Sequence, residues 1–227
     1  MALSTHLQLL HQKRGTTKWE VKNMKILSIL MCYLLGTILT GEIVTYIMTG
    51  ESASKLGTSG NPGMANVMSH LGIIPGIIVL LGDILKCVCA MLIGYYFIDA
   101  SKTGILIGGA LCTIGHDFPF WRKFKGGKGV ATTCSVIFIY GPMAGFISLI
   151  VGLLTVIVTK YLCVGAVVIP LIMIPFAFKN NLIDGLLMTG LTLLMFYKNY
   201  PQLSIIKTHQ AEKNDIIAGL KNKLGHK

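Results

Sequence analysis

IIPGIIVLLGDILKCVCAMLIGYYFI, residues 73–98, decides the fold class of this chain. A helix needs about 20 predominantly apolar residues to cross the hydrocarbon core of a bilayer, and this run is longer than that. Its two ionisable residues, Asp83 and Lys86, stand three positions apart and therefore share one helix face. Ionisable groups inside a span are expensive, and they are usually paired or functional. The stretch predicts a membrane-spanning helix that carries an internal ion pair.

The composition of the whole chain also predicts a membrane protein. Of its 227 residues, 53% are hydrophobic and 13% are charged, whereas soluble domains average about 25% charged residues. The net charge of +11 resides mainly in segments between and after apolar runs, so orientation in a bilayer explains it better than nucleic-acid binding. All six cysteines lie within apolar runs, at spacings that predict neither a metal site nor a disulfide framework.

Further apolar runs lie on both sides of residues 73–98. They occupy residues 26–48, 104–115, 130–161, 161–178 and 182–197. Residues 130–161 are too long for one straight span, and the Gly141–Pro142 pair divides them into a short and a longer helix. We expect an all-α membrane protein with about seven transmembrane helices, some of them short or broken, joined by Gly-rich motif loops.

The ends of the chain differ in composition from its middle. Residues 1–23 form a polar, basic N-terminal extension, residues 24–199 the polytopic membrane domain, and residues 200–227 a basic tail. With the C-terminus inside, most Lys and Arg of the membrane domain lie on the inner side. Residues 1–23 would add basic residues to the outer side, which favours a chain that starts at Met24. The alternative is a native cytoplasmic tail, with one helix fewer or more than seven.

The richest candidate site is GHDFPFWRKFKGGKGVATT, residues 115–133. Glycines let backbone N–H groups converge on an anion, and the helix expected from Val130 adds partial positive charge at its start. The predicted phosphate ligands are Lys125, Gly126, Gly127, Lys128, Gly129 and Thr132. His116 precedes them and is expected to orient a phosphate. The bland alternative is a positive-inside loop with flexible glycines.

A second candidate loop is TSGNPGMAN, residues 58–66. Its Ser59, Asn61 and Asn66 supply neutral hydrogen-bonding groups, and Gly60 permits close backbone approach. Gly, Asn and Pro are also ordinary turn formers, so a plain surface turn is the alternative. Asp83 and Lys86 are expected either to support this site or to pair for purely structural reasons.

Three segments resemble bacterial integral-membrane glycerol-3-phosphate acyltransferases that use acyl phosphate as donor. They are SGNPGMAN (59–66), GDILK (82–86) and HDFPFWRKFKGGKGVAT (116–132). The resemblance implies a seven-helix fold with its motif loops in the cytoplasm, in a bacterial plasma membrane. It implies acyl transfer from acyl phosphate to the 1-hydroxyl of glycerol 3-phosphate, with no cofactor. His116, Lys128 and Asn199 are then the expected catalytic residues, and the enzyme that makes acyl phosphate is an expected partner.

Several positions depart from the family pattern. Thr58, Ala65 and Ser69 stand where Gly, Thr and Arg are usual, and Phe196 and Gln202 stand where His and Arg are usual. The missing arginines and histidine remove charge-assisted contacts to phosphate, which His70 or Lys207 would have to replace. Two alternatives follow: a paralogue that is inactive or uses another acceptor, and a transporter of a phosphorylated metabolite. A transporter is disfavoured because no inverted repeat is visible.

Overall fold

The computed structural model describes residues 17–57 and 60–206. Ser59, Thr58 and Lys207 lie outside the described residues, as do residues 1–16 of the expected extension and 207–227 of the expected tail. The chain divides into two compact units, one ending at Val136 and the other beginning at Ile137. Every apolar run predicted from the sequence is helical in the structure, so the all-α class is confirmed.

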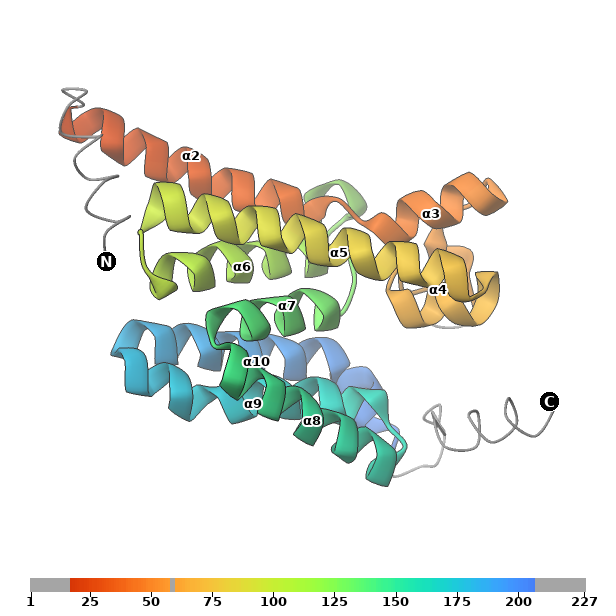
Figure 1. Cartoon of the computed structure of the whole chain (residues 1–227). Helices are drawn as coiled ribbons and strands as arrows, with labels where there is room; N and C mark the ends of the chain where they lie inside the picture. The colour runs from red at the N-terminus through yellow and green to blue at the C-terminus, as the bar shows by residue number, and fades with distance from the viewer. Residues whose placement is uncertain (1–16, 58–59, 207–227) are drawn as a thin grey trace. The chain divides into compact units, whose positions relative to one another are not determined.

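The first unit contains most of the motif residues. Its helices are α2 (Lys18–Thr37), α3 (Thr40–Thr49), α4 (Met64–Leu71), α5 (Ile73–Ile93), α6 (Lys102–Asp117) and the start of α7 (Val130–Tyr140), with short turns η1 (Ala53–Lys55), η2 (Gly94–Ile98) and η3 (Phe120–Arg122). Helices α2, α5 and α6 pack against one another, and α3 and α4 pack against α5 (Figure 1).

The first predicted span differs from the structure in two ways. It was expected to be one helix over residues 26–48, but it is broken between α2 and α3, where Ile38 and Leu39 are extended. It also begins at Lys18, because Thr17 and Glu20 form a capping box at its start. Helix α2 therefore crosses the expected boundary between residues 23 and 24.

The second candidate loop, residues 58–66, also differs from the prediction in its last part. We expected a loop, but residues 64–71 form helix α4. The flanking glycines explain its limits. Gly63 precedes the helix, and Gly72 ends it at a φ of 102°, a conformation that side chains other than glycine rarely adopt.

Close contact between α2 and α6 depends on glycines. A Cβ on Gly36 would overlap the carbonyl oxygen of Cys112, and a Cβ on Gly115 would overlap that of Tyr33. Small residues let helix backbones approach closely in membranes, where packing rather than hydrophobic burial drives helix association. This close approach brings the end of α6, which carries His116, to the break at the end of α2.

The second unit consists of the end of α7, α8 (Pro142–Thr159), α9 (Leu162–Asn180) and α10 (Leu182–Ser204). The predicted break at Gly141–Pro142 is confirmed, with Pro142 as the first residue of α8. Helix α10 continues to Ser204, past the expected end of the last span at residue 197 and past the expected domain limit at residue 199. The predicted limit of the tail stays a prediction.

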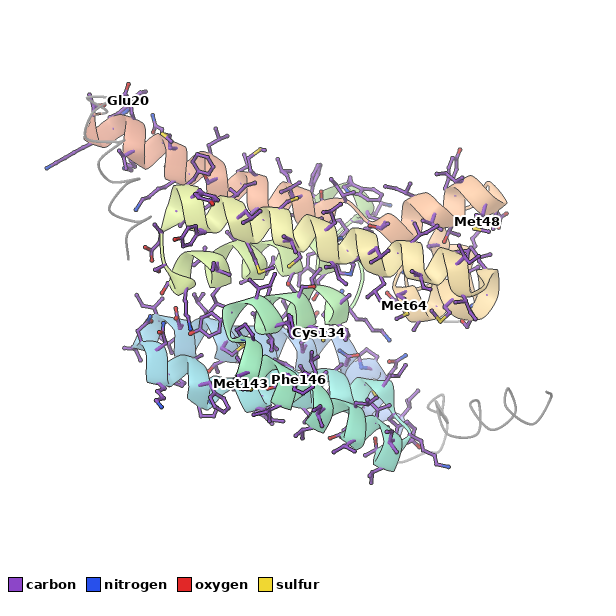
Figure 2. All side chains as sticks on the ribbon, in the orientation of Figure 1. Glu20, Met48, Met64, Cys134, Met143 and Phe146 are labelled. Atoms are coloured by element: carbon purple, nitrogen blue, oxygen red, sulfur yellow. The ribbon has the colours of Figure 1, made fainter. Side chains whose placement is uncertain are left out.

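Large apolar side chains cover the outside of both units. Met143 and Phe146 on α8 are 77% and 55% exposed (Figure 2). Among the described residues, four segments are long and apolar enough to cross a membrane: Lys18–Thr49, Ile73–Ile98, Pro142–Thr159 and Leu162–Asn180. The integral-membrane class is therefore supported, and the count of seven spans stays a prediction.

Candidate active site

The site in the first unit is built around the break between α2 and α3. A helix end leaves backbone carbonyls without intrahelical partners, and at membrane depth these must be satisfied by protein groups. The Nζ of Lys86 donates to the carbonyl oxygens of Gly36 (3.1 Å) and Ile38 (2.6 Å). The indole N–H of Trp121 donates to the carbonyl oxygen of Thr37 (2.9 Å). One lysine and one tryptophan from distant segments thus stabilise the break.

Asp83, Lys86 and His116 form a buried cluster beside this break. Their exposed fractions are only 2%, 6% and 4%. The Nζ of Lys86 lies 2.9 Å from Asp83 Oδ1 and 2.8 Å from His116 Nδ1, while Asp83 Oδ1 and His116 Nδ1 are 3.6 Å apart. The hydroxyl of Thr40 contributes a longer hydrogen bond of 3.4 Å to the same carboxylate. The expected pairing of Asp83 with Lys86 is present, and His116 belongs to it.

The Gly-rich turn, Gly126–Gly127, follows the basic loop of residues 118–125 and folds back onto the end of α6. The N–H of Gly127 donates to the carbonyl oxygen of His116 (3.0 Å), and the N–H of Gly126 donates to that of Asp117 (3.1 Å). A Cβ on Gly127 would overlap the His116 ring at Nε2. The sequence suggested that both N–H groups point at a bound anion. Instead they fasten the turn, because the chain reverses tightly between His116 and Lys128.

Gly129 precedes the first residue of α7 and caps the start of the helix. Its φ of 66° lies in the left-handed region, and its carbonyl oxygen accepts from the N–H of Thr133 (2.8 Å) and from the hydroxyl of Thr132 (3.0 Å). Thr132 also accepts from the hydroxyl of Thr113 on α6 (3.1 Å), so its hydroxyl is engaged within the protein. The Thr133 hydroxyl is buried, and within the described part of the chain it has no hydrogen-bond partner.

The lysines of this region differ in exposure. Lys125 is exposed and Lys128 is half-buried. Between them and α6, the basic loop carries two strained residues, Lys123 and Phe124, with φ values of 53° and 59°. Non-glycine residues pay for this conformation, and it persists only where surrounding contacts enforce it. The Phe124 N–H donates to the carbonyl oxygen of Pro119 (3.0 Å), which holds the turn.

Two contacts that the sequence did not predict anchor the basic loop. The guanidinium of Arg122 lies 3.2 Å from the carboxylate of Glu42 on α3, and the hydroxyl of Tyr33 on α2 donates to the carbonyl oxygen of Phe118 (2.8 Å). Glu42 could not be placed from the sequence. Its position inside an apolar run was the available signal, because a carboxylate there requires a partner.

The first motif is the SGNPGMAN segment, and its described residues, 60–66, form a compact loop that leads into α4. The side-chain amide of Asn66 donates to the carbonyl oxygens of Leu56 (3.0 Å) and Asn61 (2.9 Å). Gly60 has a φ of 53° and passes close to the backbone of Ser54. Asn66 thus holds the loop in shape with the amide hydrogens that the sequence assigned to a ligand, and Asn61 is half-buried within that loop.

Asn199 lies in the second unit. It is 2% exposed, and its amide donates to the carbonyl oxygen of Met195 one turn earlier in α10 (2.9 Å). Phe196, which replaces the expected histidine, is 47% exposed and contacts the ring of Tyr200. His70 is exposed, and its Nδ1 lies 2.9 Å from the carbonyl oxygen of Asn66.

Among the predicted site residues, the structure brings together Asp83, Lys86, His116 and the Gly126–Gly127 turn. Gly60, Asn61 and Asn66 form a second group within one loop. In the described ranges, 17–57 and 60–206, no three His, Cys, Asp or Glu side chains gather as a metal site would require. The arrangement is a rigid, positively charged turn beside a buried histidine, which suits an anionic ligand.

Comparisons with known proteins point in the same direction. A family model described as glycerol-3-phosphate acyltransferase matches residues 26–209. Glycerol-3-phosphate acyltransferase 1 of Lactobacillus johnsonii is 36% identical over 202 residues, covering 88% of this chain and 98% of that protein. The enzyme of the same name from Lactobacillus acidophilus is 33% identical over 203 residues, covering 89% and 98%. A crystal structure of PlsY, an integral membrane glycerol 3-phosphate acyltransferase in its glycerol 3-phosphate form, superposes with a TM-score of 0.77 at 25% identity, covering 86% of this chain and 98% of that one.

Proposed function

The chain belongs to the glycerol-3-phosphate acyltransferase family, and on that premise we propose that it transfers a fatty acyl group from acyl phosphate to the 1-hydroxyl of glycerol 3-phosphate. The products are 1-acylglycerol 3-phosphate and phosphate, at an early step of phospholipid synthesis. The observation that carries the proposal is the cluster of Asp83, Lys86 and His116 against the Gly126–Gly127 turn. It holds the turn beside Lys125 and Lys128 in a fixed position at the start of α7, where the charges of these two lysines suit a phosphate.

The proposed reaction needs no covalent enzyme intermediate, because acyl phosphate is a mixed anhydride and is already activated. The hydroxyl oxygen of the acceptor attacks the acyl carbon, and the bond between that carbon and the phosphate oxygen breaks. The hydroxyl proton passes to a substrate phosphate, whose second pKa is about 6. Proximity and orientation supply most of the rate.

Donor binding is assigned to the Gly-rich turn and its lysines. Lys125 and Lys128 neutralise the leaving phosphate as its charge develops. Gly126, Gly127 and Gly129 keep the turn close to His116 and α7. The buried Thr133 hydroxyl, at the first turn of α7, is a better candidate phosphate contact than Thr132, whose hydroxyl already serves Gly129 and Thr113.

Acceptor binding is assigned to the first-motif loop. Ser59, Gly60 and Asn61 contact the acceptor directly, whereas Asn66 acts by holding their loop. Asn199, in the second unit, stays a predicted catalytic residue. We further propose that the protein is a multi-pass protein of a bacterial plasma membrane with this site facing the cytoplasm, where it would receive acyl phosphate from the enzyme that makes it.

The test is product formation by the purified protein in detergent or lipidic phase. It receives palmitoyl phosphate and glycerol 3-phosphate, with palmitoyl-CoA as a parallel donor. Lysophosphatidate and phosphate should appear with acyl phosphate only, and Lys128→Ala should abolish them. Lys22→Ala, which changes an exposed lysine on α2, is the matched control. Turnover with acyl-CoA, or full activity in Lys128→Ala, would contradict the proposal.

A second candidate is an acyltransferase with a different acceptor. Ser69 and Phe196 stand in place of an arginine and a histidine that the family pattern expects. The exposed Ser69 hydroxyl donates to the carbonyl oxygen of Asn66 and also lies within hydrogen-bond distance of His70 Nδ1. Consumption of palmitoyl phosphate that does not depend on glycerol 3-phosphate would favour this candidate.

A further inference from the structure

We propose that Lys86 is a positioning residue that fixes His116 as the neutral tautomer protonated at Nε2 and directs that N–H to the Gly126–Gly127 turn, as a hydrogen-bond donor to bound phosphate. The inference rests on the proposed function for the identity of the phosphate. It goes beyond it by making His116 a fixed donor with no part as a general base.

The first step of the argument is the set of groups around Lys86. An ammonium carries three N–H donors and no lone pair. Its neighbours are the carbonyl oxygens of Gly36 and Ile38, Asp83 Oδ1 and His116 Nδ1, at 3.1, 2.6, 2.9 and 2.8 Å. Three of the four are oxygens that can only accept. Four acceptors thus share three N–H donors, and because the ammonium has no lone pair to accept a ring N–H, His116 Nδ1 at 2.8 Å faces it with a lone pair.

The second step is the tautomer of the ring. A neutral imidazole that accepts at Nδ1 carries its proton at Nε2. Asp83 Oδ1 is a second charged group near Nδ1, but it lies 3.6 Å away, beyond hydrogen-bond distance. The nearer ammonium at 2.8 Å therefore decides the tautomer.

The third step is the direction of the Nε2–H bond. Among the atoms that a Cβ on Gly127 would meet, Nε2 of His116 is the nearest, ahead of Cδ2 and Cε1. The protonated nitrogen therefore faces the backbone of the turn that precedes Lys128. A ring nitrogen that already carries its proton cannot accept one from the acceptor hydroxyl, so Nε2 can only donate.

The position of Lys86 itself is over-determined, which is what a positioning residue requires. It is held on three sides by acceptors from α2, from the break after α2, and from its own helix. A Cβ on Gly82 would collide with the Thr40 side chain, so α3 also packs tightly against this turn of α5. The ammonium has little freedom to move away from the ring.

The direct test is ¹⁵N NMR of the full-length protein labelled at histidine, in bicelles, with His116→Gln used to assign the signal. The wild-type ring should be protonated at Nε2 and unprotonated at Nδ1. Lys86→Met should move the proton to Nδ1, because Asp83 becomes the nearest charged partner of that nitrogen. A wild-type ring protonated at Nδ1, singly or together with Nε2, would overturn the inference whatever the activity is, and the wild-type result does not depend on the Lys86→Met variant.

The kinetic test separates positioning from simple structural support. The amide nitrogen of Gln can replace an Nε2 donor, whereas that of Asn replaces Nδ1, so His116→Gln should retain about tenfold more kcat/KM than His116→Asn. Lys86→Met should lower kcat/KM in the wild-type background more than in the His116→Gln background, which has no tautomer to select. Equal losses in both backgrounds would show that Lys86 only supports the fold. If no acyl transfer occurs at all, the proposed function fails while the NMR result still decides the tautomer.

Discussion

The carboxylate of Glu42 lies 3.2 Å from the guanidinium of Arg122, and it also accepts the N–H of Ala53 at 3.2 Å. Arg122 belongs to the basic loop and Ala53 to the segment that leads into the first motif. Both charged side chains are only 15% exposed, so the interaction is poorly screened by water. One carboxylate on α3 therefore ties the two motif loops to the same helix.

We predict that Glu42→Gln and Arg122→Gln each reduce the free energy of unfolding by roughly 1–3 kcal/mol and are strongly non-additive, because each leaves the other charge without its partner. Thermal unfolding in detergent, followed by tryptophan fluorescence and residual activity, measures the change. Glu51→Gln is the matched control. It breaks an exposed pair with Lys55 at 3.2 Å, for which a loss of at most about 1 kcal/mol is expected. Additive effects of the first two variants would contradict the coupling.

A second prediction concerns the turn beside His116. Gly127→Ala should reduce acyl transfer at least about a hundredfold, because its Cβ would displace the His116 ring at Nε2 and small displacements of catalytic groups are costly. Gly190→Ala on α10 is the control, since a Cβ there meets nothing within 4 Å. If Gly127→Ala releases phosphate as fast as Gly190→Ala, the turn takes no part in the reaction and the prediction is wrong.

A third prediction concerns the approach of α2 and α6. Gly115→Ala should lower the thermal unfolding temperature, with a loss of roughly 1–3 kcal/mol, because its Cβ would overlap the backbone of Tyr33. The rigid neighbour is backbone, so the helices must separate. This shift would also move His116, because His116 is the next residue after Gly115 in the chain. An unchanged unfolding temperature would mean that the helices are not this close in the folded protein.

Much of the fold was predictable from the sequence because the bilayer restricts the choices. Only helices and closed barrels of alternating strands span a bilayer, and continuous apolar runs of this length fit the helices. The Gly141–Pro142 break appears where proline chemistry requires it. The break at Ile38–Leu39 was not predictable, since no proline marks it and the nearest glycines, Gly36 and Gly41, lie inside the two flanking helices. It exists because Lys86 and Trp121, distant in sequence, stabilise the carbonyl groups that it frees.

The sequence predicted which residues form the candidate site, but it did not predict most of the contacts between them. The family resemblance, read from the motifs, is confirmed by the matches to known acyltransferases. The pairing of Asp83 with Lys86 followed from helical spacing, but the addition of His116 did not, because it depends on how α6 packs against α5. The sequence also suggested that Asn66 and Thr132 bind ligand through groups that the structure uses for loop and helix contacts. Those roles stay predictions.

A last prediction tests a buried carboxylate in the second unit. Asp184, near the start of α10, is fully buried, and its Oδ2 accepts from the hydroxyl of Tyr140 (2.7 Å) and from the amide of Asn180. In the described part of this unit its Oδ1 has no partner, so the carboxylate is already under-solvated.

Tyr140→Phe removes a hydrogen bond to this charged group, a loss of roughly 1.5–3 kcal/mol. It should lower the unfolding temperature without changing which acyl donor is used, since Tyr140 belongs to neither motif loop. Tyr46→Phe, an exposed tyrosine on α3, should leave that temperature unchanged. If Tyr140→Phe is equally neutral, the Tyr140 hydroxyl does not stabilise the Asp184 side chain and the prediction is wrong.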